Sequence, residues 1–209
     1  MLSALKLSGL SAAWLGLFLS VLIWSAIDPK DTFTWFLEVL PALIGLGSIL
    51  YTRASFPLTT LTYSLILTHC IILMIGGHYT YAEVPFFDQL AELFDSTRNN
   101  YDKLGHFAQG FVPAIITREI LIRQSVINSR RWMNFFIVCF CLGFSAFYEL
   151  IEWWVALGTG EDAEAFLGTQ GYIWDTQSDM GIALLGSLIA LFSLSHYHDK
   201  QLSAMDRKA

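Results

Sequence analysis

The chain has 209 residues, of which 55% are hydrophobic and only 14% are charged, and its formal net charge is −6. A soluble globular domain balances apolar and charged residues more evenly, so this composition excludes an ordinary soluble domain and predicts a polytopic membrane protein. The few basic residues are scattered along the chain, which leaves no electrostatic footprint for nucleic acid. The three cysteines fall inside apolar segments and indicate neither a disulfide framework nor a metal site.

The first apolar segment, residues 7–27, contains no charged residue. At about 1.5 Å per residue it is long enough to cross roughly 30 Å of hydrocarbon. A secretory signal is the alternative, but its apolar region would be shorter. The segment also ends at Trp24-Ser25-Ala26 without a small residue three positions before a plausible cleavage point. We therefore expect an uncleaved first membrane helix.

Five further apolar segments of membrane length follow, each bounded by polar or turn residues. They cover residues 33–51, 56–76, 104–122, 132–157 and 179–197. The sequence therefore predicts an all-α fold: a single integral membrane domain over residues 1–209, built as a bundle of six transmembrane helices.

The segment 104–122 has the weakest helical pattern of the six. Two glycines and Pro113 weaken its helix, and its inner end carries Arg118 and Glu119. A re-entrant course for this segment would reduce the number of crossings to five.

An even number of crossings returns both termini to one side of the membrane. In that arrangement nine basic residues face the side of the termini and three face the other. The nine are Lys6, Arg53, Arg118, Arg123, Arg130, Arg131, Lys200, Arg207 and Lys208, and the three are Lys30, Arg98 and Lys103. By the positive-inside rule both termini are predicted to be cytoplasmic.

Two of the predicted external connections are long. The first, residues 77–103, has apolar residues at helical spacing with acids between them, so we expect a short helix lying in the membrane interface and covering the site described below. Those apolar residues are Phe86, Phe87, Leu90, Leu93 and Phe94. The second, residues 158–176, has four glycines, several acids and no basic residue. It fits no EF-hand spacing and predicts a tight surface loop.

Six ionisable side chains form three pairs at the ends of these membrane-length segments. The pairs are Asp102 with His106, Glu149 with Glu152, and Asp175 with Asp179. Each pair has i,i+3 or i,i+4 spacing, so both members lie on one helical face. Charge inside a bilayer is costly and is rarely kept without a use. Because the predicted topology places all three pairs on the external side, we expect them to converge there.

Glu149 and Glu152 lie one turn apart, so both are ionised together only when a cation or a donor lies between them. A functional site and a purely structural network are equally compatible with this spacing. In the structural alternative the two carboxylates would pair with Lys103, Arg98 and tyrosine or tryptophan donors.

Asp102 can orient the imidazole of His106 and fix its tautomer, which suits general acid–base chemistry or metal binding. The alternative is a histidine that is only hydrogen-bonded at the membrane interface. Three other histidines illustrate that alternative: His69, His196 and His198. His78, after two glycines at the external end of its segment, either joins the cluster or serves its loop.

Asp175 and Asp179 lead into the last segment, where acids can cap a helix and meet the positive end of its dipole. Capping is the stronger interpretation for Asp175. Asp179 lies a turn deeper, ahead of Gly181 and Gly186, where a neighbouring helix can approach closely.

One imidazole with up to five carboxylates forms an oxygen-rich environment that suits Mg²⁺, Mn²⁺ or Ca²⁺, or Zn²⁺ with fewer ligands. As candidate catalytic groups we take His106, Glu149, Glu152 and Asp179, and as candidate substrate-binding groups Lys103, Asp102 and Asp175. The candidate metal ligands are Glu149, Glu152, Asp179 and His106. The motifs GxSxG, HExxH and the P-loop are absent from the sequence.

Three strings of the sequence, residues 100–107, 148–153 and 171–180, resemble the YjdF family of bacterial inner-membrane proteins, and the resemblance covers the whole chain. It implies a bacterial inner-membrane location and supplies no reaction. More distantly, the pattern of acids and His106 is similar to that of VanZ-like membrane proteins. The sequence departs from that pattern because Glu152 stands where a Gln is usual, and because Ser178 and Asp179 lack the usual preceding Arg.

Three functions are compatible with these observations. The first is an external site that binds or modifies an anionic lipid or envelope-precursor head group, with a divalent cation or Lys103 meeting the phosphate and His106 as acid/base. The second is a proton- or cation-coupled transporter of small solutes that uses Glu149 and Glu152, although no inverted repeat is visible. The third is a structural or partner-binding protein whose polar network only fixes helix packing. We favour the first, because the site lies at the level of the outer-leaflet head groups and membrane lipids would be its partners.

Overall fold

The computed structural model describes residues 9–95, 98–159 and 172–207, and within these ranges it contains seven helices and no strand. They are α1 (Gly9–Ala26), α2 (Thr32–Thr52), α3 (Thr60–His78), α4 (Pro85–Leu93), α5 (Tyr101–Arg123), α6 (Arg130–Thr159) and α7 (Asp175–Asp206). The predicted all-α helix bundle is therefore confirmed. The six long helices correspond one to one with the six predicted segments, and α4 lies in the connection where a short helix was expected.

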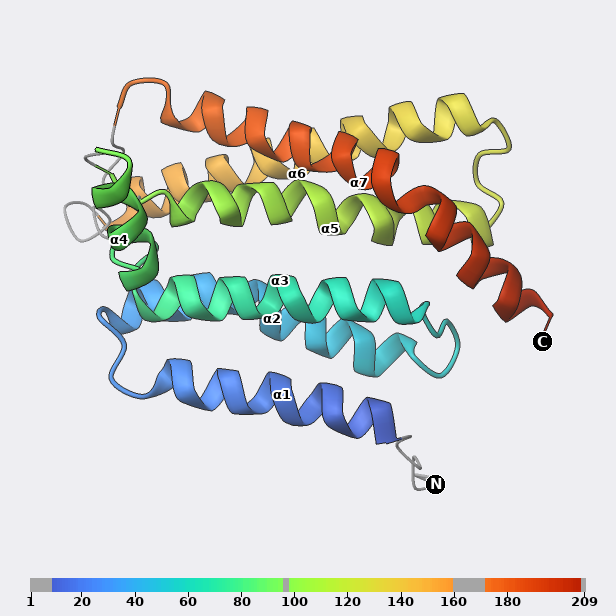
Figure 1. Cartoon of the computed structure of the whole chain (residues 1–209), viewed down its shortest axis with the longest axis horizontal. Helices are drawn as coiled ribbons and strands as arrows, with labels where there is room; N and C mark the ends of the chain where they lie inside the picture. Colours follow the sequence, from blue (N-terminus) through green and yellow to red (C-terminus); the bar gives the residue numbers. More distant parts are fainter. Residues whose placement is uncertain (1–8, 96–97, 160–171, 208–209) are drawn as a thin grey trace.

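The long helices run side by side in two groups (Figure 1). Helices α1, α2 and α3 lie on one side of the bundle, α5, α6 and α7 lie on the other, and the packing of α3 against α5 joins the two groups. We call the end of the bundle that carries α4 the outer end, and the opposite end the inner end. Helix α1 begins and helix α7 ends at the inner end.

Local chemistry explains where several helices begin. The side chain of Asp31 accepts a hydrogen bond from the backbone N–H of Thr34 at 2.6 Å and caps α2. The hydroxyl of Thr59 caps α3 in the same way through Thr62. For this reason the third segment begins its helix at Thr60 rather than at the predicted residue 56. The last helix continues past the predicted residue 197 to Asp206.

Five of the helices, α1, α2, α3, α6 and α7, are long and apolar enough to cross a membrane. Helix α5 is not among them, yet it is one continuous helix of 23 residues that runs the length of the bundle. Because α3, α6 and α7 pack around it, α5 presents much of its surface to protein and can carry polar residues without exposing them to lipid. The continuous helix lacks the turn that a re-entrant course needs, and the number of crossings, five or six, stays a prediction.

Helices α5 and α7 approach each other closely at two glycines. A Cβ atom on Gly110 would lie 1.8 Å from the backbone oxygen of Ala183, and one on Gly186 would lie 2.3 Å from the backbone oxygen of Phe107. The expected close approach is thus confirmed at Gly186. It is wrong for Gly181, where a Cβ atom would meet nothing within 4 Å. This contact brings the outer ends of α5 and α7 together.

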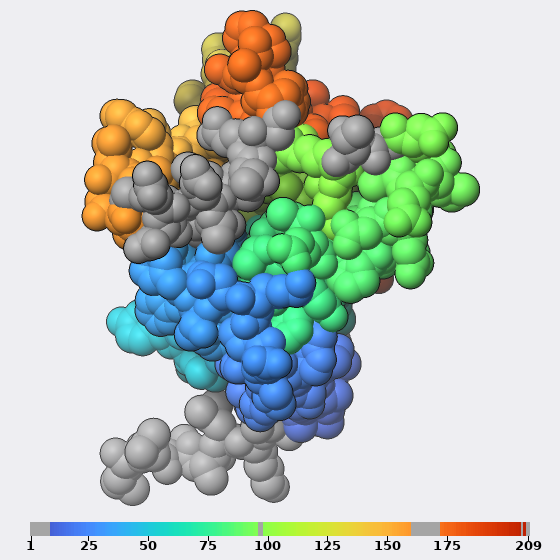
Figure 2. Space-filling view, turned by 90° about the vertical axis from the view of Figure 1, so that its left-hand side faces the viewer, coloured from blue at the N-terminus to red at the C-terminus, as the bar shows by residue number. Residues whose placement is uncertain are grey.

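Helix α4 lies across the outer end of the bundle (Figure 1). It begins with Pro85 in its first turn, and the ring of Phe87 packs 5.1 Å from that of Tyr101 at the start of α5. Phe86 and Leu93 remain exposed, as expected of a helix in the membrane interface. Figure 2 shows the outer end with α4 at one edge of this face. Most of the predicted surface loop at 158–176 lies outside the described residues.

Candidate functional site

The three predicted pairs of ionisable residues converge at the outer end of the bundle. Helix α5 contributes Asp102, Lys103 and His106, helix α6 contributes Glu149 and Glu152, and helix α7 contributes Asp175 and Asp179. We call these seven residues the outer cluster. All seven sequence-predicted site residues therefore belong to one region, which no short-range sequence spacing alone could establish.

Lys103 joins α5 to α7 through an almost buried set of hydrogen bonds. Its Nζ atom donates to Asp175 Oδ1 and to Asp179 Oδ1, both at 2.6 Å, and to Ser178 Oγ at 2.8 Å. The side chains of both aspartates are only 5% exposed. Each carboxylate thus has a charged partner, which offsets the cost of removing it from water.

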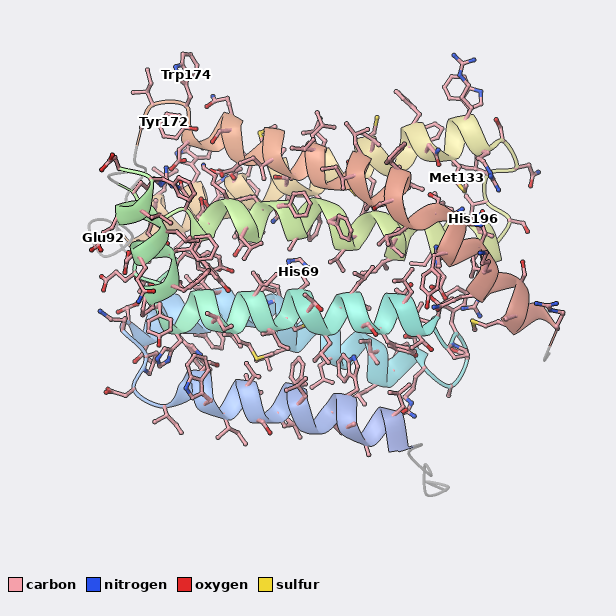
Figure 3. The ribbon with its side chains drawn as sticks, viewed as in Figure 1. His69, Glu92, Met133, Tyr172, Trp174 and His196 are labelled. Atoms are coloured by element: carbon pink, nitrogen blue, oxygen red, sulfur yellow. The ribbon has the colours of Figure 1, made fainter. Side chains whose placement is uncertain are left out.

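Arg98, in the segment before α5, adds a second cation to this arrangement. Its Nη1 atom donates to Asp175 Oδ1 at 2.6 Å. Partial burial lowers the pKa of Arg98, but the hydrogen bond and the charge of Asp175 outweigh that effect and raise it overall. The ring of Tyr172, which Figure 3 labels, covers both cations at 5.9 Å from Arg98 Cζ and 5.5 Å from Lys103 Nζ.

Asp175 lies in the first turn of α7. It is the first residue of α7, the cap position is Trp174, and the structure shows no side-chain capping bond there. As expected, its charge thus lies at the positive end of the helix dipole, and Asp175 also accepts hydrogen bonds from two cations.

His106 lies between three polar side chains. Its Nε2 atom is 3.3 Å from Asp102 Oδ1 and 3.7 Å from Glu149 Oε1, and its Nδ1 atom is 3.1 Å from Gln109 Oε1. When Nδ1–H donates to the amide oxygen of Gln109, Nε2 faces two carboxylates. A lone pair in that position would be repelled by them, so a cation belongs there: a proton on Nε2 or a metal ion between the groups.

Glu149 has a side chain that is only 8% exposed, and its Oε1 atom lacks a hydrogen-bond partner among the described residues. A buried carboxylate oxygen without a partner is costly, typically by about 1–3 kcal/mol or more. The ion pairs that Arg98 and Lys103 form within the described residues go to aspartates. The expected structural pairing of Glu149 and Glu152 with these two cations is therefore wrong.

Glu38 of α2 lies beside the outer cluster, although the pattern of paired ionisable residues does not include it. Its side chain accepts a hydrogen bond from the hydroxyl of Tyr148 at 3.1 Å, and the residue is only 6% exposed. One feature of the sequence could have identified it: Glu38 is the only charged residue of the apolar segment 33–51. The ring of Tyr81 packs nearby against Gly76 of α3 and, more loosely, against Gly105 of α5.

A cavity of about 210 Å³ extends from this region between α2, α3, α5 and α6. At its outer end the polar lining residues are Glu38, Tyr81, Asp102, His106, Tyr148 and Glu152. Deeper in the bundle its lining is mostly apolar and includes Ile66, Val112, Ile116 and Phe144. One continuous space therefore joins acidic and imidazole groups to a hydrocarbon-like wall.

Three residues of the outer cluster have donor atoms close enough to share one metal ion. These atoms, from Asp102, His106 and Asp179, lie within 4.8 Å of one another. The predicted ligand set contained His106 and Asp179 but not Asp102. Glu149 lies beside this group, with its Oε1 atom 3.7 Å from His106 Nε2, whereas Glu152 lines the cavity.

Of the remaining histidines, His78 serves its loop, which was one of its two expected roles, whereas His69 differs from expectation. His78 contacts Ser25 O through Nδ1 at 3.1 Å and stacks near Trp24, so it serves the connection between α1 and α2 rather than the outer cluster. His69 lies in the middle of α3 and lines the cavity, so its interpretation as an interfacial residue is wrong.

His198 is fully buried in a second polar network at the inner end. Its Nε2 atom is 3.1 Å from Glu119 Oε2, and its Nδ1 atom is 3.0 Å from Arg118 Nη1. Glu119 also accepts hydrogen bonds from the hydroxyls of Thr59 and Thr62. The interpretation of His198 as a hydrogen-bonded residue at the membrane interface is thus wrong. This network ties α3, α5 and α7 together and explains how α5 tolerates a charged pair near its inner end.

Comparisons with known proteins agree with this architecture. Residues 10–200 match a family described as "Predicted membrane protein (DUF2238)". The chain is also 50% identical over 182 residues to "Inner membrane protein YjdF" of Escherichia coli (strain K12), an alignment that covers 87% of each chain.

No solved structure matches the chain. The resemblance to the YjdF family is thus confirmed, whereas neither match supports the more distant similarity to VanZ-like proteins. On these grounds the chain belongs to the DUF2238 family of predicted membrane proteins.

Proposed function

We propose that this multi-pass protein of the bacterial inner membrane binds or modifies an anionic lipid or envelope-precursor head group at the outer cluster, with the help of a divalent cation. The observation that carries the proposal is the cavity, because its polar outer end and its apolar wall match the two parts of an amphiphile. The outer cluster would then take the head group, and the apolar wall would take the chain.

Charge explains the need for a cation. The outer end of the cavity carries Glu38, Asp102 and Glu152, which would repel a bare phosphate. The phosphate contact expected from Lys103 has little support, since its Nζ atom already donates to three oxygens. A divalent cation on carboxylate and imidazole ligands would present positive charge to the phosphate instead.

The structure supports a specific set of ligands for that cation. Asp102, His106 and Asp179 supply the three clustered donor atoms, and the unpartnered Oε1 of Glu149 lies 3.7 Å from His106 Nε2. Gln109 holds the far side of the imidazole ring, as outer partners of metal-bound histidines usually do. When no metal is bound, the same imidazole is placed to exchange a proton with a head group.

The proposal can be tested in a strain that lacks the gene. We expect the wild-type gene to restore the envelope lipid profile and glycopeptide sensitivity of the parent strain, and variants with His106→Ala or Glu149→Ala to fail to do so. His196→Ala is the matched control, because His196 is exposed on α7 (Figure 3). Full complementation by both site variants, at wild-type protein levels, would reject the proposal in favour of a network that serves packing alone.

A further inference from the structure

His69 is a polar residue in the deep, mostly apolar part of the cavity. It lies in the middle of α3, and Figure 3 shows it pointing from α3 toward α5. It lines the cavity together with Ile66 and Val112. Among residues 9–95, 98–159 and 172–207, the structure gives it no hydrogen bond or ion pair. A histidine at this depth without a polar partner is a functional candidate by default.

The depth of His69 relative to the outer cluster is set by α3. Gly76 contacts the ring of Tyr81, and so does Gly105, the residue before His106. His69 precedes Gly76 by seven residues (76 − 69). At about 1.5 Å per residue, it therefore lies roughly 10 Å deeper in the bundle than the outer cluster.

The lining of the cavity includes positions of both α2 and α6 that lie deeper than the hydrogen bond joining Tyr148 of α6 to Glu38 of α2. Helix α2 packs mainly against α3, whereas α6 packs against α5 and α7. Between them the cavity is lined by Gly45 of α2 and Phe144 of α6, and Phe144 is 41% exposed. A Cβ atom on Gly45 would meet nothing within 4 Å, so the space beside this glycine is open.

We propose that the amphiphile is an ester-linked glycerophospholipid and that His69 donates a hydrogen bond to one of its ester carbonyls. This inference rests on the proposed function. The phosphate of such a lipid would lie at the outer cluster, with the glycerol esters below it. A polyprenyl phosphate has no acceptor below its phosphate and would leave the imidazole N–H unpaired. Entry of the lipid is lateral, through the gap between α2 and α6.

The test compares lipids that differ only in the ester group. Binding to the purified full-length protein is measured by native mass spectrometry with dioleoyl phosphatidylglycerol, its diether analogue and undecaprenyl phosphate. We expect the wild type to prefer the ester lipid over the diether by roughly threefold to tenfold, the effect of one hydrogen bond. The His69→Phe variant should lose this preference, whereas the control His196→Phe should keep it.

The outcomes separate the two proposals. Equal binding of ester and diether lipids that still requires His106 would overturn the role of His69 and leave the head-group site intact. Preference for undecaprenyl phosphate over the ester lipid would also overturn the role of His69 and leave the head-group site intact. If the wild type binds none of the three lipids, the proposed function fails as well.

Lateral entry has its own matched pair of variants. Gly45→Leu should fill the open space and weaken binding of all three lipids. Gly47→Leu serves as the control, because Gly47 is exposed, lies outside the cavity lining and also has open space around it. Unchanged binding by Gly45→Leu would contradict entry between α2 and α6.

Discussion

Lys103 is the residue that balances the charge of the outer cluster. It donates to Asp175 and Asp179, both of which are nearly buried, and Arg98 also donates to Asp175. Without Lys103, the nearly buried carboxylate of Asp179 would lose its ion-pair partner. The residue therefore acts as a structural partner that holds α5 and α7 together at the site.

We expect Lys103→Met to lower the free energy of unfolding by about 3–5 kcal/mol, the usual effect of removing one member of a buried ion pair. Thermal unfolding in detergent measures the change. Lys30→Met is the control, because the Lys30–Glu83 pair is half exposed and should matter little. Similar midpoints for both variants would show that the Lys103 bonds add no stability.

Glu149 differs from Lys103 because its Oε1 atom makes no hydrogen bond to any described residue that a substitution could break. We expect Glu149→Gln to change the unfolding midpoint less than Lys103→Met does when cations are removed. It should also abolish the stabilisation that added Mn²⁺ gives to the wild type, since the amide is a weaker ligand. A large loss of stability without cations, combined with a normal envelope, would indicate that Glu149 serves only packing.

At the scale of the helices, the contact between α5 and α7 determines how closely the outer-cluster residues of these two helices approach each other. Gly186 meets the backbone of Phe107, which cannot move aside as a flexible side chain can. Gly186→Val should therefore destabilise the fold by about 1–3 kcal/mol or more. Gly181→Val is the control, since that position faces open space. Equal unfolding midpoints for the two variants would contradict the close packing.

The sequence was enough to place the six long helices, because each is a run of apolar residues ended by polar or turn residues. It could not distinguish Gly181 from Gly186, since which glycine meets α5 depends on how α7 is rotated. The same limit applies to His69 and His198. Both belong to apolar segments, and only tertiary packing shows that one lines a cavity and the other joins a buried ion network.

The sequence also predicted most, but not all, of the ionisable residues in and beside the outer cluster. The spacing of acids and His106 identified seven residues that the fold does bring together. Glu38 was missed because it comes from a helix far away in the sequence and has no ionisable partner at helical spacing. Its partner is Tyr148, which is 110 residues away along the chain. A contact between residues so far apart along the chain depends on how all the helices pack, which the sequence pattern does not show.

For the whole molecule, the orientation in the membrane determines which leaflet the outer cluster faces. The excess of basic residues at the inner end predicts that both termini are cytoplasmic. A green fluorescent protein fused to the C-terminus should therefore fluoresce, and an alkaline phosphatase fused at the same point should be inactive. The reverse pattern would place the outer cluster on the cytoplasmic side and contradict a site for outer-leaflet lipids.

The most direct test of the head-group site is lipid binding with and without a divalent cation. Purified wild-type protein is titrated with dioleoyl phosphatidylglycerol in Mn²⁺ and then in excess EDTA, and His106→Ala is measured beside it. We expect tight binding by the wild type only in Mn²⁺, and weak binding by His106→Ala in both conditions. Binding that is the same for both proteins and unaffected by EDTA would contradict a cation-assisted head-group site at the outer cluster.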